Sequence, residues 1–157
     1  MEHVLQREGI SSFTDAGLQA VLYVADGDMR NALNALQSTF AGFGAITPDT
    51  VFKVCDQPHP ALVQKVLEHC LKGDVTAARD GLEALVRKGY AESDVVQTVF
   101  RVSKSLACDE RLKLDFVREI ATTHMRVAEG LSSLVQLCGL CARLCRLAKE
   151  HKEATSK

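Results

Sequence analysis

Helical periodicity is the feature of this sequence that most constrains its fold. Up to about residue 149, apolar side chains recur at spacings of three and four, which places them along one face of a helix. No stretch shows the strict alternation of apolar and polar residues that is typical of a half-buried strand. The composition agrees, because Ala, Leu and Val dominate and aromatic residues make up only 5% of the chain. We therefore predict an all-α protein.

Capping and turn residues divide the chain into separate helices. Thr14, Asp28 and Thr47 are each suited to cap a helix, and Thr47 is followed by a proline that suits the first helical position. The stretch "DQPHP", residues 56–60, carries two of the three prolines and is the best linker candidate. Beyond it, we predict longer helices over residues 60–72, 74–88, 93–106, 110–128 and about 131–149.

The last two of these patterns carry the most apolar surface. Residues 110–128 are apolar on two faces, one with Phe116 and one with Leu114, so we expect this helix to lie at the centre of its bundle. His124 shares the Phe116 face and is expected to be a core histidine. The final helix is apolar nearly all round, but polar residues interrupt it, which favours a buried helix over a membrane span. Residues 152–157 are expected to form a disordered tail.

Charge and cysteine content exclude several classes of protein. A formal net charge of −1 argues against a general binder of nucleic acid or membrane surfaces. Cys138, Cys141 and Cys145 lie on one face of the last helix, but a second ligand pair at metal spacing is absent. We expect no metal site, and we interpret all six cysteines as reduced thiols of an intracellular protein.

The stretch "ADGDMRNALNALQS", residues 25–38, is the best candidate for a binding site. Its helix begins after Asp28, and Arg30 lies in the first turn, where the positive end of the helix dipole disfavours a cation. A bound phosphate would explain this placement, because the guanidinium and the free amides both attract anions. Pairing with Asp26 or Asp28, or simple solvation, is the alternative. A similar stretch, "GDVTAARDGL", has Thr76 in place of the arginine, so the local fold does not require one.

The apolar face of this helix is predicted to pack into the core. It comprises Met29, Ala32, Leu33, Leu36, Phe40 and Phe43.

A basic segment ends the last helix. It comprises Arg143, Arg146, Lys149 and Lys152. Cations there complement the C-terminal end of the helix dipole, and a contact with DNA phosphates or with a neighbouring subunit is the alternative.

Several blocks together resemble the small subunits of replication factor C, which are AAA+ clamp loaders. The sensor 2 segment of that family is similar to "GDMRNALNALQSTFAGFG". Further blocks follow in the family's order: "VFKVCDQPHPALV", "FRVSKSLA", "KLDFVREIATTHMRVAEG" and "LCGLCARLCR". The resemblance implies that residues 1–45 are part of the helical AAA+ lid domain. It also implies that residues 46–151 form the collar, the oligomerisation domain.

The resemblance also implies a function and its site residues. Arg30 would be the sensor 2 arginine, which contacts the γ-phosphate of ATP, and Met29 would pack either beside the nucleotide or in the core. The implied partners are the other replication factor C subunits, the sliding clamp and primer–template DNA, and the implied compartment is the nucleus.

The motifs of a complete ATPase are not found in this sequence. It contains no GxxxxGK[ST] loop, no acidic Walker B strand and no arginine-finger segment. We therefore expect ATP and Mg²⁺ to be used only together with an ATPase core, and no hydrolysis by this chain alone. The alternatives are a stand-alone helical interaction adaptor and a truncated inhibitory isoform, neither with a nucleotide role.

Overall fold

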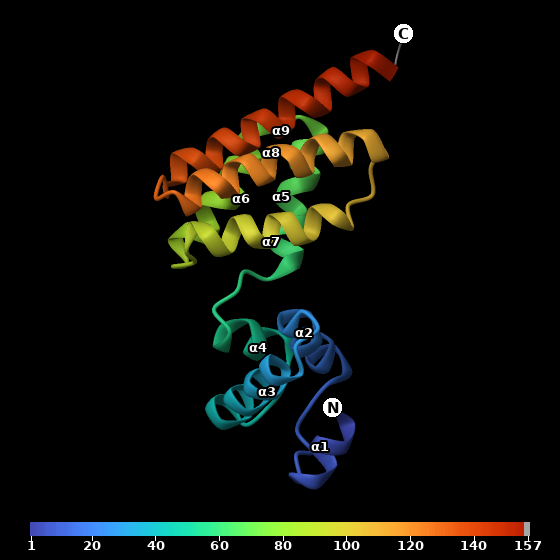
Figure 1. The fold of residues 1–157 in the computed structure, drawn as a ribbon, viewed down its shortest axis with the longest axis vertical. Helices are drawn as coiled ribbons and strands as arrows, with labels where there is room; N and C mark the ends of the chain where they lie inside the picture. The colour runs from blue at the N-terminus through green and yellow to red at the C-terminus, as the bar shows by residue number, and fades with distance from the viewer. Residues whose placement is uncertain (156–157) are drawn as a thin grey trace. The chain divides into compact units, whose positions relative to one another are not determined.

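The computed structural model describes residues 1–155, which form helices with no strand among them (Figure 1). The prediction of an all-α protein is confirmed. The chain divides into two compact units, Met1–Gln57 and the residues from Pro58 onward. The boundary lies at the start of the proline-containing stretch predicted as a linker, and each unit has its own buried core.

The N-terminal unit contains four helices, α1 (Glu2–Arg7), α2 (Asp15–Ala25), α3 (Met29–Phe43) and α4 (Pro48–Val54). Helix α2 packs against both α3 and α4, and α3 also contacts α4. The three predicted caps are confirmed, because Thr14, Asp28 and Thr47 each accept a hydrogen bond from a backbone amide of their own helix. These bonds satisfy amides that the first turn of a helix leaves free.

The segment before α4 is fixed to the segment before α2. The backbone of Ile46 donates to Ser12 O (2.9 Å) and accepts from Thr14 N (3.0 Å), which makes an isolated parallel bridge between residues 13 and 46. Gly17 in α2 lies directly against this bridge, because a Cβ atom there would overlap the Ile46 carbonyl oxygen. Only glycine permits this close approach between the helix and the backbone.

The C-terminal unit contains five helices, α5 (Pro60–Lys72), α6 (Val75–Arg87), α7 (Glu92–Lys104), α8 (Glu110–Ala128) and α9 (Leu134–Thr155). Helix α5 contacts α6, α7 and α9, whereas α9 contacts all four of the other helices of the unit. These two helices therefore form the middle of the bundle, and the large apolar content of α9 is explained by its many neighbours.

Two predicted boundaries require correction. The first unit extends to Gln57 rather than to residue 45, because α4 packs on α2 and α3. The predicted disordered tail at 152–157 is wrong for its first four residues, since α9 continues to Thr155, and Lys152 Nζ donates to the carbonyl oxygen of Leu71 at 2.8 Å. Residues 156 and 157 lie outside the described part of the chain.

Helix α8 is not central, in contrast to the prediction from its two apolar faces. It contacts only α7 and α9 among its neighbours in the bundle. One face, with Phe116 and Ile120, is fully buried, but Leu114 and Met125 on the other side are largely exposed. His124 is also exposed rather than in the core. The apolar pattern of α8 therefore did not reveal which of its two faces is covered by neighbouring helices.

Candidate functional site

The candidate phosphate site lies at the N-terminus of α3. Asp28 caps this helix, and its Oδ1 accepts a hydrogen bond from the amide of Arg30 at 2.8 Å. The Arg30 side chain is exposed, and among residues 1–155 it makes no ion pair with an acidic side chain. The predicted alternative of an Arg30 pair with Asp26 or Asp28 is therefore not seen. The guanidinium is available to an anion.

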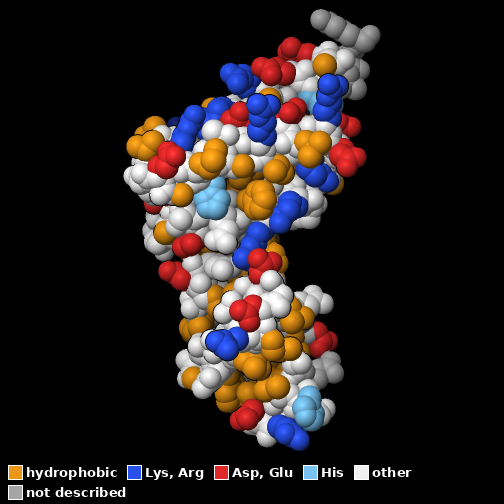
Figure 2. All heavy atoms as spheres, viewed as in Figure 1, with side chains coloured by type: hydrophobic (Ala, Val, Ile, Leu, Met, Phe, Trp, Pro, Cys, Tyr) orange, Lys and Arg blue, Asp and Glu red, His pale blue; other side chains and the backbone are white. Residues whose placement is uncertain are grey.

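The exposure of Met29 corrects the predicted core face of α3. Met29 is 62% exposed, and Phe40 and Phe43 also lie at the surface. The buried residues of α3 form a narrower stripe of mostly small side chains: Ala32, Ala35, Leu36 and Thr39. Small residues let α2 and α4 pack closely on that stripe, and the larger apolar side chains flank it. Figure 2 shows hydrophobic side chains gathered at the surface of the N-terminal unit.

The hollow beside Met29, at the start of α3, is too small for a nucleotide. It has a volume of about 100 Å³ and is lined by residues of α2 and the start of α3, Met29 among them. Pockets that enclose small molecules usually measure about 300–1,000 Å³. In the described part of the chain, no group of three or more His, Cys, Asp and Glu side chains could hold a metal ion. These residues by themselves do not form a site for ATP and Mg²⁺, although Arg30 suits one phosphate.

The basic segment of α9 makes contacts within its own unit. Arg143 Nε donates to Glu119 Oε2 at 2.9 Å, and another guanidinium nitrogen donates to the hydroxyl of Thr123 at 2.8 Å. Arg146 approaches Glu150 at 3.6 Å, and Lys152 binds a backbone carbonyl of α5. Arg143 and Lys152 are thus engaged within the unit, whereas Arg146 and Lys149 stay exposed, so the contacts account for only part of the segment.

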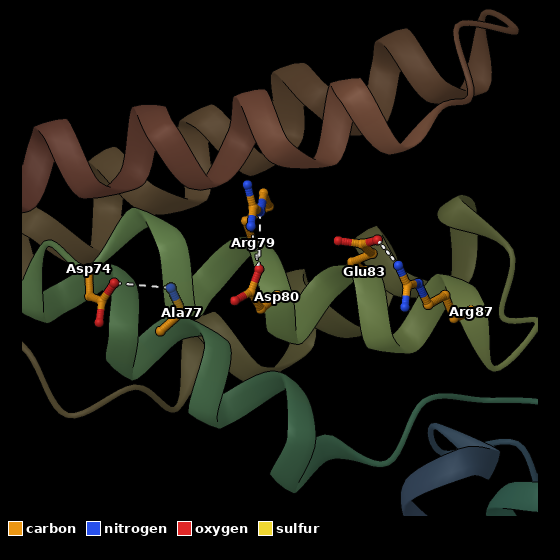
Figure 3. A network of polar contacts seen from close by, with 6 residues as sticks. All are labelled: Asp74, Ala77, Arg79, Asp80, Glu83 and Arg87. Carbon is orange, nitrogen blue, oxygen red and sulfur yellow. Dashed lines mark hydrogen bonds and ion pairs between the residues drawn. The ribbon is translucent and has the colours of Figure 1, made fainter.

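The polar contacts of α6 provide a comparison for the surroundings of Arg30 on α3. Asp74 caps the helix by accepting from the amide of Ala77 at 3.0 Å, as Asp28 caps α3 (Figure 3). The other two contacts are the exposed ion pairs Arg79–Asp80 and Glu83–Arg87. The arginines of α6 have acidic partners beside them, whereas no ion pair is seen for Arg30 among residues 1–155. Arg30 also lies in the first turn of its helix, which makes it the candidate ligand-binding side chain.

The cysteines form a group that the sequence did not predict. Cys70 of α5 and Cys141 and Cys145 of α9 are buried in the same hydrophobic cluster, where α5 packs on α9. Interaction with the Cys141 thiol and then burial raise the pKa of the Cys70 thiol above its ordinary value of 9.0. Cys138, which shares the sequence spacing, is only half-buried. The spacing of Cys141 and Cys145 along α9 indicated that they share one face of this helix. Cys70 is far away in the sequence, and it is buried in the same core only because α5 packs on α9.

An outward apolar stripe on α8 is the second surface feature of interest. Leu114 and Met125 are 66% and 60% exposed, and Ala121 between them is exposed as well. The stripe runs along the helix, because these positions are separated by seven and four residues. Large exposed apolar residues in a row are typical of a surface that contacts another protein.

No helix in the described part of the chain is long and apolar enough to cross a membrane.

Comparisons with known proteins identify the family. Residues 58–143 match the replication factor C C-terminal domain. Over 132 residues the chain is 46% identical to replication factor C subunit 2 of Arabidopsis thaliana, covering 84% of this chain and 40% of the relative. It is 42% identical over 137 residues to replication factor C subunit 4 of Saccharomyces cerevisiae, covering 86% of this chain and 42% of the relative.

The match extends into the N-terminal unit as well. A probable replication factor C subunit 2 of Dictyostelium discoideum is 40% identical over 153 residues, which cover 97% of this chain and 45% of the relative. The chain thus spans less than half the length of these relatives and corresponds to their C-terminal part. The family domain begins within one residue of the boundary between the two structural units. The chain therefore belongs to the replication factor C family, as the sequence blocks indicated.

Proposed function

We propose that this chain is the assembly part of a clamp-loader small subunit. Its C-terminal unit would be the collar that joins the subunit to its neighbours in a heteropentamer, and its N-terminal unit would be the lid. The complex would load the sliding clamp onto primer–template DNA in the nucleus, with ATP. The match of residues 58–143 to the replication factor C C-terminal domain carries this proposal. The separate core of that unit supports it, since an assembly domain must be folded in its own right.

The outward stripe of α8 is the surface that we assign to the neighbouring subunit. The relatives are named as subunits, so a partner of the same helical family is the expected occupant. Such a partner would cover Leu114 and Met125 with an apolar helix face, removing both side chains from water. Burying one such side chain is worth about 1.5–3 kcal/mol. Placing a carboxylate there would be unfavourable by a similar amount or more, because a charge would be desolvated without a partner.

Co-purification with the other replication factor C subunits tests this assignment. The variant Leu114→Asp should fold, since the side chain is exposed, and should lose assembly. Val75→Asp is the matched control, because Val75 is also an exposed, branched apolar residue but stands at the first position of α6, where an acid is favourable. Full assembly of Leu114→Asp would contradict the assignment. Failure of the unaltered chain to join the complex would contradict the proposed function itself and favour a stand-alone adaptor.

Arg30 is proposed to act as the sensor 2 arginine. Its exposed guanidinium at the start of α3 would bind the γ-phosphate of ATP held by an ATPase core, and the loss of that phosphate would release it. Met29 beside it would contact the nucleotide. The observation that supports this role is the exposed position of Arg30 in the first turn of α3, with no ion pair to an acidic side chain among residues 1–155.

The test uses the variant Arg30→Ala in a subunit that carries the ATPase core, with Arg87→Ala as the control at another exposed arginine. We expect ATP-dependent clamp loading to fall for Arg30→Ala and not for Arg87→Ala. Equal activity of the two variants would exclude the sensor role. This chain alone is expected to show no ATP hydrolysis, because its sequence contains neither a GxxxxGK[ST] loop nor an acidic Walker B strand. If the chain acted as an inhibitory isoform, it would assemble with the other subunits, and the resulting complex would load clamps less efficiently.

A further inference from the structure

The outward face of α8 carries positive charge as well as apolar side chains. Leu114, Ala121 and Met125 form its exposed apolar stripe. Arg118 lies one turn beyond Leu114 and shares this face, because side chains four residues apart on a helix lie one above the other. The Arg118 side chain is exposed. Figure 2 shows hydrophobic side chains along the course of α8, with Lys and Arg side chains beside them.

The end of α7 adds a second cation to this face. Helices α7 and α8 are joined by the short connection 105–109 and pack against each other, so the end of α7 lies beside the start of α8 (Figure 1). Lys104, the last residue of α7, is exposed, and its Nζ lies 4.7 Å from the centre of the Phe100 ring. Lys113, which directly precedes Leu114, is half-buried. Cations from both helices therefore flank the start of the apolar stripe.

Lys104, Lys113 and Arg118 form a group that we call the basic cluster. Among residues 1–155 no ion pair is seen for any of the three. Three charges of one sign around an apolar stripe produce a local positive potential, although the whole chain carries a formal net charge of −1. Such a face favours a partner that places acidic residues around an apolar contact.

The acidic residues of α8 lie mainly away from the basic cluster. Glu119 lies on the side toward α9, where its Oε2 accepts a hydrogen bond from Arg143 Nε at 2.9 Å. Asp115, one turn earlier, lines a hollow together with residues of α9. Glu110 lies in the first turn, where the helix dipole favours a carboxylate. The acids in the body of α8 thus face α9, whereas the cations accompany the outward stripe.

We propose, on the basis of the assembly function proposed above, that the neighbouring subunit covers this face with an amphipathic helix whose apolar residues are flanked by Asp and Glu. The apolar residues of that helix cover Leu114 and Met125, and its carboxylates pair with the basic cluster. Complementary charges of this kind speed association and disfavour partners with like charges at the same place. The basic cluster thereby selects which of the homologous subunits stands on this side of the chain.

Carbodiimide cross-linking of the whole chain in complex with the other replication factor C subunits tests this proposal. The reagent joins a lysine amine to a carboxylate in direct contact with it, and the linked peptides are identified by mass spectrometry. We expect links from Lys104 or Lys113 to Asp or Glu in a helix of one neighbouring subunit. Lys65, an exposed lysine of α5, is the internal control and should not link to that helix. Links from Lys104 and Lys113 only within the chain would overturn the proposal.

A charge-reversed variant measures what the basic cluster contributes. Lys104→Glu combined with Arg118→Glu changes two exposed side chains, and this variant should associate with the same subunits about tenfold more slowly at low salt. The difference should shrink at high salt, because ions screen exposed charges. Lys65→Glu combined with Arg87→Glu is the matched control and should associate as fast as the unaltered chain. Equal slowing of the control would overturn the proposal, since only net charge would then matter.

The remaining outcomes separate this inference from the proposed function. An unchanged association rate for the Lys104 and Arg118 variant, with Leu114→Asp still unable to assemble, would overturn the acidic partner and leave the proposed function intact. Failure of the unaltered chain to join the other subunits would overturn both. Binding of a DNA duplex that requires the basic cluster and displaces the subunits would assign this face to nucleic acid and overturn the inference.

Discussion

Replacing Gly17 by alanine tests how the N-terminal unit is held together. A Cβ atom at Gly17 would overlap the carbonyl oxygen of Ile46 and lie 2.8 Å from its carbonyl carbon and 3.0 Å from Thr47 Cα. All three of these atoms belong to the backbone, so no side-chain rotation can make room. Either α2 or the segment before α4 has to move.

The segment before α4, which contains Ile46, is firmly held in this unit. Ile46 is fully buried, and its backbone makes the hydrogen bonds to Ser12 and Thr14 described above. A shift would weaken both bonds, at about 1 kcal/mol each. Overpacking in a closed core costs about 1–3 kcal/mol in addition. Alanine has a higher helix propensity than glycine by about 1 kcal/mol, which offsets part of this loss. The net expectation is a destabilisation of about 2–4 kcal/mol.

Gly42→Ala is the matched control for this substitution. Gly42 is also inside a helix of the same unit, α3, but a Cβ atom there would have no neighbour within 4 Å. The same chemical change should therefore increase the stability of the unit by about 0.5–1 kcal/mol through helix propensity and a less flexible unfolded chain.

Urea denaturation of the whole chain, followed by hydrogen exchange and mass spectrometry, measures both effects in the correct unit. For Gly17→Ala, peptides from residues 12–24 and 44–54 should exchange faster and unfold at lower urea, while peptides from α5 to α9 stay unchanged. For Gly42→Ala, peptides of α3 should exchange more slowly. If Gly17→Ala were as stable as Gly42→Ala, the close approach of α2 to Ile46 would not exist in solution.

Three further predictions concern caps, ion pairs and thiols. Asp28→Ala should destabilise the N-terminal unit by about 1 kcal/mol, measured by urea denaturation, because the Arg30 amide loses its acceptor. Glu119→Gln should reduce the free energy of unfolding of the C-terminal unit by about 1 kcal/mol, because its partner Arg143 is only partly exposed to water, and the loss should persist in 1 M salt. Above pH 9 this unit should become less stable by up to about 1.4 kcal/mol per pH unit, because Cys70 stays protonated when folded but ionises when unfolded, and Cys70→Ala should show a shallower pH dependence.

Local features were predicted well from the sequence. The ends of the helices at residues 60–72 and 110–128 are confirmed to the residue, and Thr14, Asp28 and Thr47 cap helices as expected. These features depend on interactions within a few residues, namely capping, proline placement and apolar periodicity, and so they are encoded in short stretches of sequence.

Features that depend on which helices meet were predicted poorly. Met29 and Phe43 share the apolar periodicity of α3, yet they are exposed, because the helices that cover α3 reach only its small residues. The second apolar face of α8 is exposed for a similar reason, since only α7 and α9 pack on this helix. Periodicity identifies the apolar face of a helix but not its neighbours. The burial of Cys70 and Cys141 in one core, on two helices far apart in the chain, could not be predicted for the same reason.

These exposed apolar residues are themselves informative about how the protein works. Burying Leu114 and Met125 would increase the stability of the isolated chain, and a polar residue at either exposed position would not reduce it. Their exposure is consistent with α8 having a second function besides closing its bundle. In the same way, Arg30 adds nothing to the capping of α3, which Asp28 already provides, and the corresponding position of α6 is Thr76. Leu114, Met125 and Arg30 thus contribute little to the stability of the fold, and the proposed function gives each of them a role. Leu114 and Met125 would contact a neighbouring subunit, and Arg30 would bind a phosphate.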